Sequence, residues 1–311
     1  MPPMMRPNPA AHVDLDGAWS PENPGPFFGQ YLDVREWGPR LRYSAPPALL
    51  DAFFETVQPH LGSFTLYGSG DFHHLSALWL RARQEPLILV SFDNHPDWDT
   101  RPPDWGCGGW INRALELPHV TRASVWGCGN FELNWPHRLF GNRDALASGR
   151  LEVFPWRERI GRSARKRWPA LAYDDWRPAF SRFARSLAGR RVYVTVDLDC
   201  LRSGEAVTNW ENGLFTAADV AWALDELRSV ADVIGGDLCG AWSIPRHARF
   251  KQWLSSRLDH PRQRPVDAAH AVRANERALR IIWRALTAGA STDLASGYEH
   301  YAGADQRYAH P

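Results

Sequence analysis

The chain has 311 residues and a formal net charge of +1, from 36 lysines and arginines against 35 aspartates and glutamates. This balance excludes the strongly basic footprint of a dedicated nucleic-acid binder and the composition of an acidic disordered chain. No stretch approaches the roughly 18–20 apolar residues of a membrane span, and the first residues hold no apolar core of a signal peptide. Four scattered cysteines form no CxxC pair, which is typical of a reducing compartment. We therefore expect a folded, cytoplasmic protein.

Strands and helices are predicted to alternate along most of the chain. Apolar or β-branched runs predict strands at 63–67, 87–92, 123–126, 151–154, 192–196 and 233–238. Helical periodicity predicts helices at 75–82, 111–117, 173–187, from 216 onward, and at 268–286. Thr216 and Asp219 have the spacing of a capping box. This alternation is typical of a parallel sheet with helices on both faces, so we predict an α/β fold of three layers, α/β/α.

The sequence predicts one domain. Residues 46–290 hold the regular pattern, and no internal repeat or low-complexity linker divides them. Residues 1–45 are rich in proline, glycine and aromatic side chains without periodicity, which predicts a loop-rich N-terminal lead that wraps the domain. Residues 291–311 are predicted to form a polar, aperiodic C-terminal tail.

Three polar clusters follow predicted strands. They read GSGDFHH at 68–74, DNHPD at 93–97 and DLD at 197–199. Ligands of open parallel sheets bind beyond the carboxyl ends of the strands, so we expect the three clusters to meet there. A single cluster of this kind is as often a helix cap as a ligand set, and the prediction of a binding site therefore depends on all three.

The aspartates and histidines of these clusters are candidate metal ligands. Asp93, His95 and Asp97 occupy alternate positions and project to one side of an extended segment, as do Asp197 and Asp199. Their carboxylates would repel one another unless a cation neutralised them. With His95 and one histidine of the first cluster, the set is too rich in nitrogen for calcium and too rich in carboxylate for a structural zinc. It suits two divalent ions that share a water molecule, and manganese is the expected metal.

In this order, the clusters resemble the motifs GGDHS, DAHxD and SxDxD of the ureohydrolase family, which includes arginase, agmatinase, formiminoglutamase and guanidinobutyrase. The resemblance covers about residues 60–245 and continues through Thr208–Leu214 and Val233–Cys239. It implies a mostly parallel, eight-stranded sheet and a binuclear centre with two Mn²⁺ ions per chain.

The resemblance also implies which residues bind the metal. The implied ligands are His74, Asp93, His95, Asp97, Asp197 and Asp199. Asp93 and Asp197 would bridge both ions, His74 and Asp97 would complete the first site, and the remaining two residues would complete the second. Aligning HHLSA with the family's DHSLA favours His74 over His73, and the additional residue in GDFHH leaves this choice open.

Two family features are missing from the sequence. The family's GNxHG segment carries a proton-shuttle histidine, whereas residues 105–110 read WGCGGW. The family's guanidinium-binding glutamate corresponds to Gly240, or to Asp237 if the register shifts. Arginine or agmatine is therefore in doubt as the substrate. The candidate substrate contacts are Asp237, Glu211, Trp110 and Trp210.

These features predict a binuclear manganese hydrolase that cleaves a C–N bond of a guanidino, amidino or related linear amide-type small molecule. A metal-bridging hydroxide would attack the planar carbon, and Asp97 would pass the proton to the leaving amine. The alternatives are a deacetylase-like amidohydrolase with a single Zn²⁺ ion and a catalytically silent, metal-bound scaffold of the same fold. Ureohydrolases often form trimers or hexamers, so the resemblance implies a homo-oligomer. Neither a nucleic acid nor a membrane is expected as a partner.

Overall fold

The computed structural model describes residues 10–19, 29–101, 105–260 and 265–289. Within these residues an eight-stranded sheet has the order β2-β1-β4-β10-β9-β5-β7-β8, and each neighbouring pair is parallel. Its strands are β1 (Ala10–Asp14), β2 (Gln30–Asp33), β4 (Phe64–Tyr67), β5 (Leu87–Phe92), β7 (Val120–Cys128), β8 (Leu151–Pro155), β9 (Arg191–Asp197) and β10 (Asp232–Cys239). Two-residue strands β3 (Ser44–Ala45) and β6 (Trp105–Gly106) form a separate antiparallel pair.

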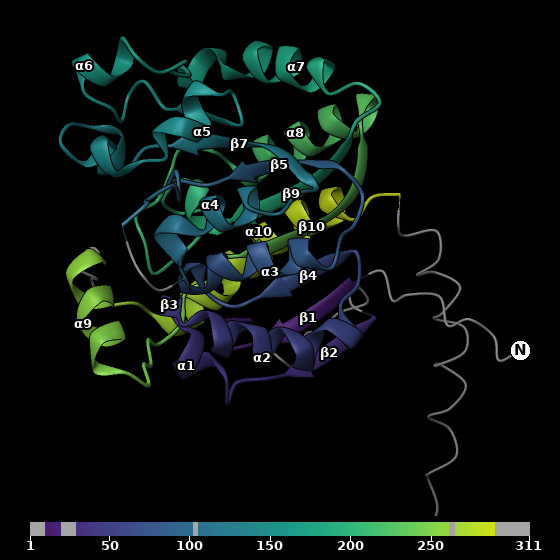
Figure 1. Ribbon diagram of the computed structural model, residues 1–311, viewed down its shortest axis with the longest axis vertical. Helices are drawn as coiled ribbons and strands as arrows, with labels where there is room; N and C mark the ends of the chain where they lie inside the picture. Colours follow the sequence, from purple (N-terminus) through teal and green to yellow (C-terminus); the bar gives the residue numbers. More distant parts are fainter. Residues whose placement is uncertain (1–9, 20–28, 102–104, 261–264, 290–311) are drawn as a thin grey trace, which may run out of the picture.

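Helices cover both faces of the sheet, which confirms the predicted α/β/α fold (Figure 1). One face packs against α7 (Trp176–Ser186), α8 (Ala217–Val230) and α10 (Ala268–Leu286). The other packs against α2 (Pro47–Val57), α3 (Ser76–Arg81) and α4 (Trp110–Leu115). The remaining α-helices are α1 (Gly38–Leu41), α5 (Arg143–Ala147), α6 (Arg162–Arg165) and α9 (Phe250–Asp259), of which α9 stands apart from both layers in Figure 1.

Short 3₁₀ helices join several of these elements. They are η1 (Gln58–His60), η2 (Gly70–Leu75), η3 (Cys107–Gly109), η4 (Phe131–Leu133), η5 (His137–Phe140), η6 (Tyr173–Asp175) and η7 (Leu198–Cys200). Among the described residues, no helix has both the length and the apolar character needed to cross a membrane.

The central strands are apolar throughout because both of their faces are covered. In β5 and β9, Val90 and Val194 pack into the core on the α7–α8–α10 face. Their neighbours Leu89 and Tyr193 pack into the core on the opposite face. Successive side chains of a strand point to opposite faces, so a strand in the middle layer needs apolar residues at both positions.

Helix α8 begins as the sequence predicts. The side chain of Thr216 accepts a hydrogen bond from the backbone of Asp219 at 3.0 Å, and the Asp219 carboxylate accepts one from the backbone of Thr216 at 2.9 Å. This capping box satisfies backbone donors that the first helical turn leaves free. The helix then buries Val220, Leu224 and Leu227 on one side.

The structure differs from the sequence prediction at residues 1–45, where we expect a loop-rich lead. Strands β1 and β2 both lie in this segment and extend the central sheet beyond β4. Strand β1 contains the buried polar residues His12 and Asp14, so its sequence lacks the continuous apolar run that marks the other buried strands. Helix α9 is also not predicted. The C-terminal tail at 291–311 lies outside the described residues.

Aromatic side chains fill the core between β7 and α7. Trp126 stacks on Phe154 with ring centroids 4.0 Å apart, and Phe180 contacts Trp126 at 4.8 Å and Phe92 at 5.6 Å. Phe180 is fully buried. Much of the chain's aromatic content therefore stabilises the fold.

We expect Phe180→Ala to lower the free energy of unfolding by about 3–5 kcal/mol, because it removes a buried ring and leaves a cavity. Phe250→Ala is the matched control, since Phe250 is 74% exposed on α9 and its loss should change stability by no more than about 0.5 kcal/mol. Urea denaturation of the two variants measures both values. Equal losses would contradict the assignment of the core.

Candidate metal centre

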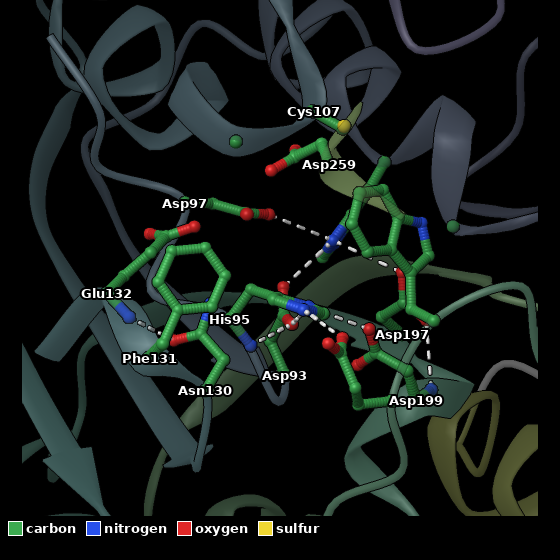
Figure 2. A pocket seen from close by; sticks show the side chains of 15 residues that line it. Asp93, His95, Asp97, Cys107, Asn130, Phe131, Glu132, Asp197, Asp199 and Asp259 are labelled. Carbon is green, nitrogen blue, oxygen red and sulfur yellow. Dashed lines mark hydrogen bonds and ion pairs between the residues drawn. The ribbon is translucent and has the colours of Figure 1, made fainter. Parts of the chain in front are cut away.

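The three polar clusters meet at the carboxyl ends of neighbouring strands. Cluster 68–74 enters η2 after β4, cluster 93–97 follows β5, and cluster 197–199 enters η7 at the end of β9. These strands lie near one another in the sheet order β4-β10-β9-β5. Figure 2 shows Asp93, Asp197 and Asp199 grouped with His95 in one cavity.

His73 lies among three carboxylates. Its Nδ1 is 3.0 Å from Oδ2 of Asp93, 3.4 Å from Oδ2 of Asp97 and 3.6 Å from Oδ2 of Asp197. The imidazole is buried, and its ring centroid is 4.7 Å from that of Trp110. One ring nitrogen is thus surrounded by oxygen ligands, as in a metal site.

His95 defines a second group of ligands beside the first. Its Nδ1 lies 2.8 Å from Oδ2 of Asp199 and 3.5 Å from Oδ1 of Asp93. The side chains of Asp93, His95 and Asp199 could hold one ion, and those of His73, Asp93 and Asp97 could hold another. Asp93 belongs to both groups, so its carboxylate can bridge two neighbouring ions.

The donor set fits divalent cations. Oδ2 of Asp93 is buried and faces Nδ1 of His73 at 3.0 Å, so an ion that replaced the proton between them would bind both atoms. A third group joins His73 and Asp197 to the thiol of Cys239, whose Sγ lies 3.5 Å from Oδ2 of Asp197. Buried carboxylates and imidazoles are ligands that Mn²⁺ and Zn²⁺ accept.

The structure corrects the choice between the two neighbouring histidines. His73 contacts the carboxylates, whereas His74 belongs to none of the ligand groups formed by the described residues. The two lie in η2, and successive side chains of a 3₁₀ helix, with three residues per turn, point about 120° apart. The ring of His74 therefore points elsewhere in the core, where burial lowers its pKa to about 3. Sequence alignment could not detect this rotation.

The crowding of carboxylates changes their protonation. Burial, followed by the charge of Asp93, raises the pKa of Asp97 to about 7. Burial and the charge of Asp197 likewise raise the pKa of Asp199. Although burial opposes the charged form of His73, its hydrogen bonds and charge interactions with aspartates raise its pKa. The cluster therefore retains protons that a bound cation would displace.

Asp97 is fixed from behind by Trp110. The indole Nε1 of Trp110 donates a hydrogen bond to Oδ2 of Asp97 at 2.5 Å, and Asp97 has a left-handed φ of 46°. Trp110 was a candidate substrate contact, but it is fully buried and is not among the described residues that line the cavity. It orients the carboxylate of Asp97.

Asp237 does not reach the cavity either, contrary to its prediction as a substrate contact. It lies in β10, fully buried, and accepts hydrogen bonds from the hydroxyls of Thr195, Tyr193 and Ser76 at 2.6, 2.9 and 3.0 Å. At Gly240 φ is +103°, and an added Cβ would lie 2.2 Å from Oδ1 of Asp197. Neither position can present a carboxylate to a substrate.

Glu211 and Trp210, the other two candidate substrate contacts, both line the cavity. Oε2 of Glu211 is 3.4 Å from Nε2 of His95. The indole of Trp210 stacks on His260 at 4.1 Å and donates a hydrogen bond to Oδ1 of Asp71 at 3.2 Å. Trp210 thus forms a flat wall of the cavity beside His95.

Two acidic residues of the cavity wall were not predicted. Glu132 lies in η4, directly beyond β7, and Asp259 is the last residue of α9. Burial raises the pKa of Glu132 to about 8, and its Oε2 has no hydrogen-bond partner among the described residues. The strand-end rule could have identified Glu132. Nothing in the sequence places Asp259 near the clusters, because α9 is distant in the chain.

A second cavity of about 320 Å³ adjoins the first. The two share part of their wall, including Cys107, Phe131, Glu132 and Asp259. The carboxylates of Glu132 and Asp259 thus lie between the ligand cluster and a space large enough for part of a small molecule.

Comparison with known proteins supports the assignment of the fold. No protein-family model matches the chain. An uncharacterised protein of Thermotoga maritima is 28% identical over 203 residues, which are 64% of this chain and 66% of that protein. Arginase from Medicago truncatula has a TM-score of 0.51 at 15% identity, covering 89% of this chain and 87% of that one. Proclavaminate amidino hydrolase from Streptomyces clavuligerus has a TM-score of 0.50 at 14% identity, with 90% and 92% covered.

At these identities the likeness shows the fold. The chain has the arginase-like α/β fold, with a cluster of carboxylates and imidazoles at the carboxyl ends of its strands. The arginase and the amidino hydrolase share this fold with the chain.

We expect divalent cations to stabilise the metal-free protein, because they neutralise the buried carboxylates. At an ion concentration about 100 times the Kd, one site adds about 2.7 kcal/mol to the free energy of unfolding. His73→Gln should reduce this gain and His74→Gln should retain it, although both replace buried imidazoles. Thermal unfolding with and without Mn²⁺ measures the gain. A larger gain in His73→Gln than in His74→Gln would contradict the placement of His73.

Proposed function

We propose that this chain is a metallohydrolase of the ureohydrolase family, which binds two Mn²⁺ ions and cleaves a C–N bond of a small guanidino or amidino substrate. One observation above all supports it. Two groups of three ligands, joined by the shared carboxylate of Asp93, lie in a cavity at the carboxyl ends of the strands. A single-metal site needs no shared carboxylate.

The ligands divide between two ions as the geometry groups them. His73 and Asp97 would hold the first ion, His95 and Asp199 the second, with Asp93 common to both. The carboxylate of Asp197 faces His73 and would join the first group. Bound divalent ions supply Lewis-acid chemistry and generate a nucleophile from water near neutral pH.

Asp97 is the residue best placed to move protons. It lines the cavity, and the hydrogen bond from Trp110 holds one of its oxygens. A carboxylate fixed at the ligand cluster can accept a proton from the attacking water and pass it to the leaving nitrogen. We assign this role to Asp97 because the histidine of the family's shuttle segment is missing.

The charge of the cavity wall favours a cationic substrate. Glu132, Glu211 and Asp259 line the cavity in addition to the aspartates of the ligand cluster. A guanidinium or amidinium group is a planar cation that pairs well with carboxylates. Its positive charge would favour the ionised form of Glu132, whose pKa burial raises to about 8 in the free protein. These side chains therefore supply from loops and α9 the negative charge that Gly240 cannot.

We expect wild-type protein purified without chelator and supplied with manganese to bind close to two Mn²⁺ ions per chain. Asp93→Ala should lose both ions, because it removes the shared ligand, and Asp199→Ala should mainly lose one. Elemental analysis measures the content. One zinc ion per chain would instead favour a deacetylase-like amidohydrolase, and protein without metal would refute the proposal. Two ions without turnover of any guanidino, amidino or formimino compound would favour a silent scaffold.

Glu132→Gln should raise the KM for a cationic substrate about tenfold or more with little change in kcat. The reason is that a hydrogen bond between charged groups contributes about 1.5–3 kcal/mol. Glu55→Gln is the matched control, because Glu55 is exposed on α2 and outside the cavity. Steady-state kinetics on the best substrate of the screen gives both constants. An unchanged KM in Glu132→Gln would remove this residue from the substrate site.

A further inference from the structure

The buried carboxylate of Asp237 is connected to the metal cluster through a single hydroxyl. Asp237 in β10 is the register partner of Thr195 in β9, so their side chains are neighbours on one face of the sheet. Oγ1 of Thr195 lies 2.6 Å from Oδ1 of Asp237 and 2.9 Å from Nε2 of His73. The three residues form a continuous chain of hydrogen bonds that ends at the cluster.

The direction of these hydrogen bonds follows from the donors and acceptors. A threonine hydroxyl has one proton, and an ionised carboxylate only accepts. The hydroxyl of Thr195 therefore donates its proton to Asp237 in the 2.6 Å hydrogen bond. Tyr193 and Ser76 also donate to Asp237, so its oxygens are saturated with donors. The remaining lone pairs of the Thr195 oxygen can only accept. The hydroxyl of Ser76 lies 3.3 Å from this oxygen but gives its proton to Asp237, so the nearer Nε2–H of His73, at 2.9 Å, is the donor.

We propose that Thr195 and Asp237 are positioning residues that fix the tautomer of His73. They hold the proton on Nε2, so that a metal ion can replace the proton on Nδ1 and bind its lone pair among the carboxylates of Asp93 and Asp197. A neutral imidazole must present its lone pair to bind a metal, and a hydrogen bond at the other nitrogen decides which lone pair is free. The inference rests on the metal centre proposed above.

A merely structural role makes a different prediction. If Thr195 only satisfies polar groups inside the sheet, its loss lowers the stability of the protein and does not selectively lower the affinity for either ion. If it fixes the ring of His73, its loss weakens the ion that His73 binds and spares the ion that His95 binds. The two ions of one chain therefore serve as an internal comparison.

The experiment titrates metal-free protein with Mn²⁺ and follows free Mn²⁺ by electron paramagnetic resonance. Thr195→Val keeps the shape of the side chain and removes the hydroxyl, and we expect one of the two ions to bind about 10–100-fold more weakly. Thr195→Ser restores the hydroxyl and should return the affinity close to that of the wild type. Ser91→Ala is the matched control. Ser91 in β5 is the register partner of Thr195 and is buried, and its hydroxyl has no hydrogen-bond partner in the part of the chain that the structure describes.

A second measurement needs no destabilising variant. Nitrogen-15 NMR of wild-type protein loaded with diamagnetic Zn²⁺ should show the His73 ring with its proton on Nε2, assigned by the shift that Thr195→Ser causes. A proton on Nδ1 would overturn the inference even if Thr195→Val fails to fold. Unchanged affinity for both ions in Thr195→Val would overturn it as well.

The outcomes separate this inference from the proposed function. Wild-type protein that binds no divalent ion refutes both. Wild-type protein that binds two ions, with both affinities kept in Thr195→Val, refutes the positioning role alone. The positioning role is supported if Thr195→Val loses affinity for one ion only, Thr195→Ser restores that affinity, and Ser91→Ala keeps the affinity for both ions. This holds whatever substrate the enzyme uses.

Discussion

The structure depends on the crowding of four buried carboxylates at one edge of a parallel sheet. Asp93, Asp97, Asp197 and Asp199 all lie at strand ends and are almost fully buried. Charges of one sign in such a place are stable only with protons or cations between them. In the chain alone, the pKa values of Asp97, His73 and His95 are raised, so that protons stay between the carboxylates. Two divalent ions are the response that we propose for the working protein.

Much of the surrounding structure holds this cluster in place. Trp110 fixes Asp97, and Thr195 links His73 to the buried Asp237. In η2, the carboxylate of Asp71 forms an ion pair with Arg42 at 2.6 Å and another with His260, at the end of α9, at 2.7 Å. Helix α9, which lies apart from the sheet layers, is thereby tied to η2 two residues before His73. These ion pairs tie α9, which brings Asp259 to the cavity wall, to the 3₁₀ helix that carries His73.

The missing guanidinium-binding glutamate has a structural explanation. The backbone at Gly240 lies so close to Asp197 that no side chain fits. Carboxylates reach the cavity from the end of β7 and from α9 instead, through Glu132 and Asp259. In our proposal, the chain keeps the metal ligands at the strand ends, and the carboxylates that bind the substrate come from η4 and α9.

The sequence by itself determined the parallel α/β sheet, the capping box of α8 and the convergence of the three polar clusters, because these follow from local periodicity and from strand ends. Only the tertiary structure decided the rest. Strand β1 is a strand because β2 and β4 pair with it, and His73 faces the cluster because of the rotation within η2. Asp237 is buried behind the cluster and Asp259 is brought to the cavity wall by contacts between residues far apart in the chain. Local sequence patterns carry no record of such contacts.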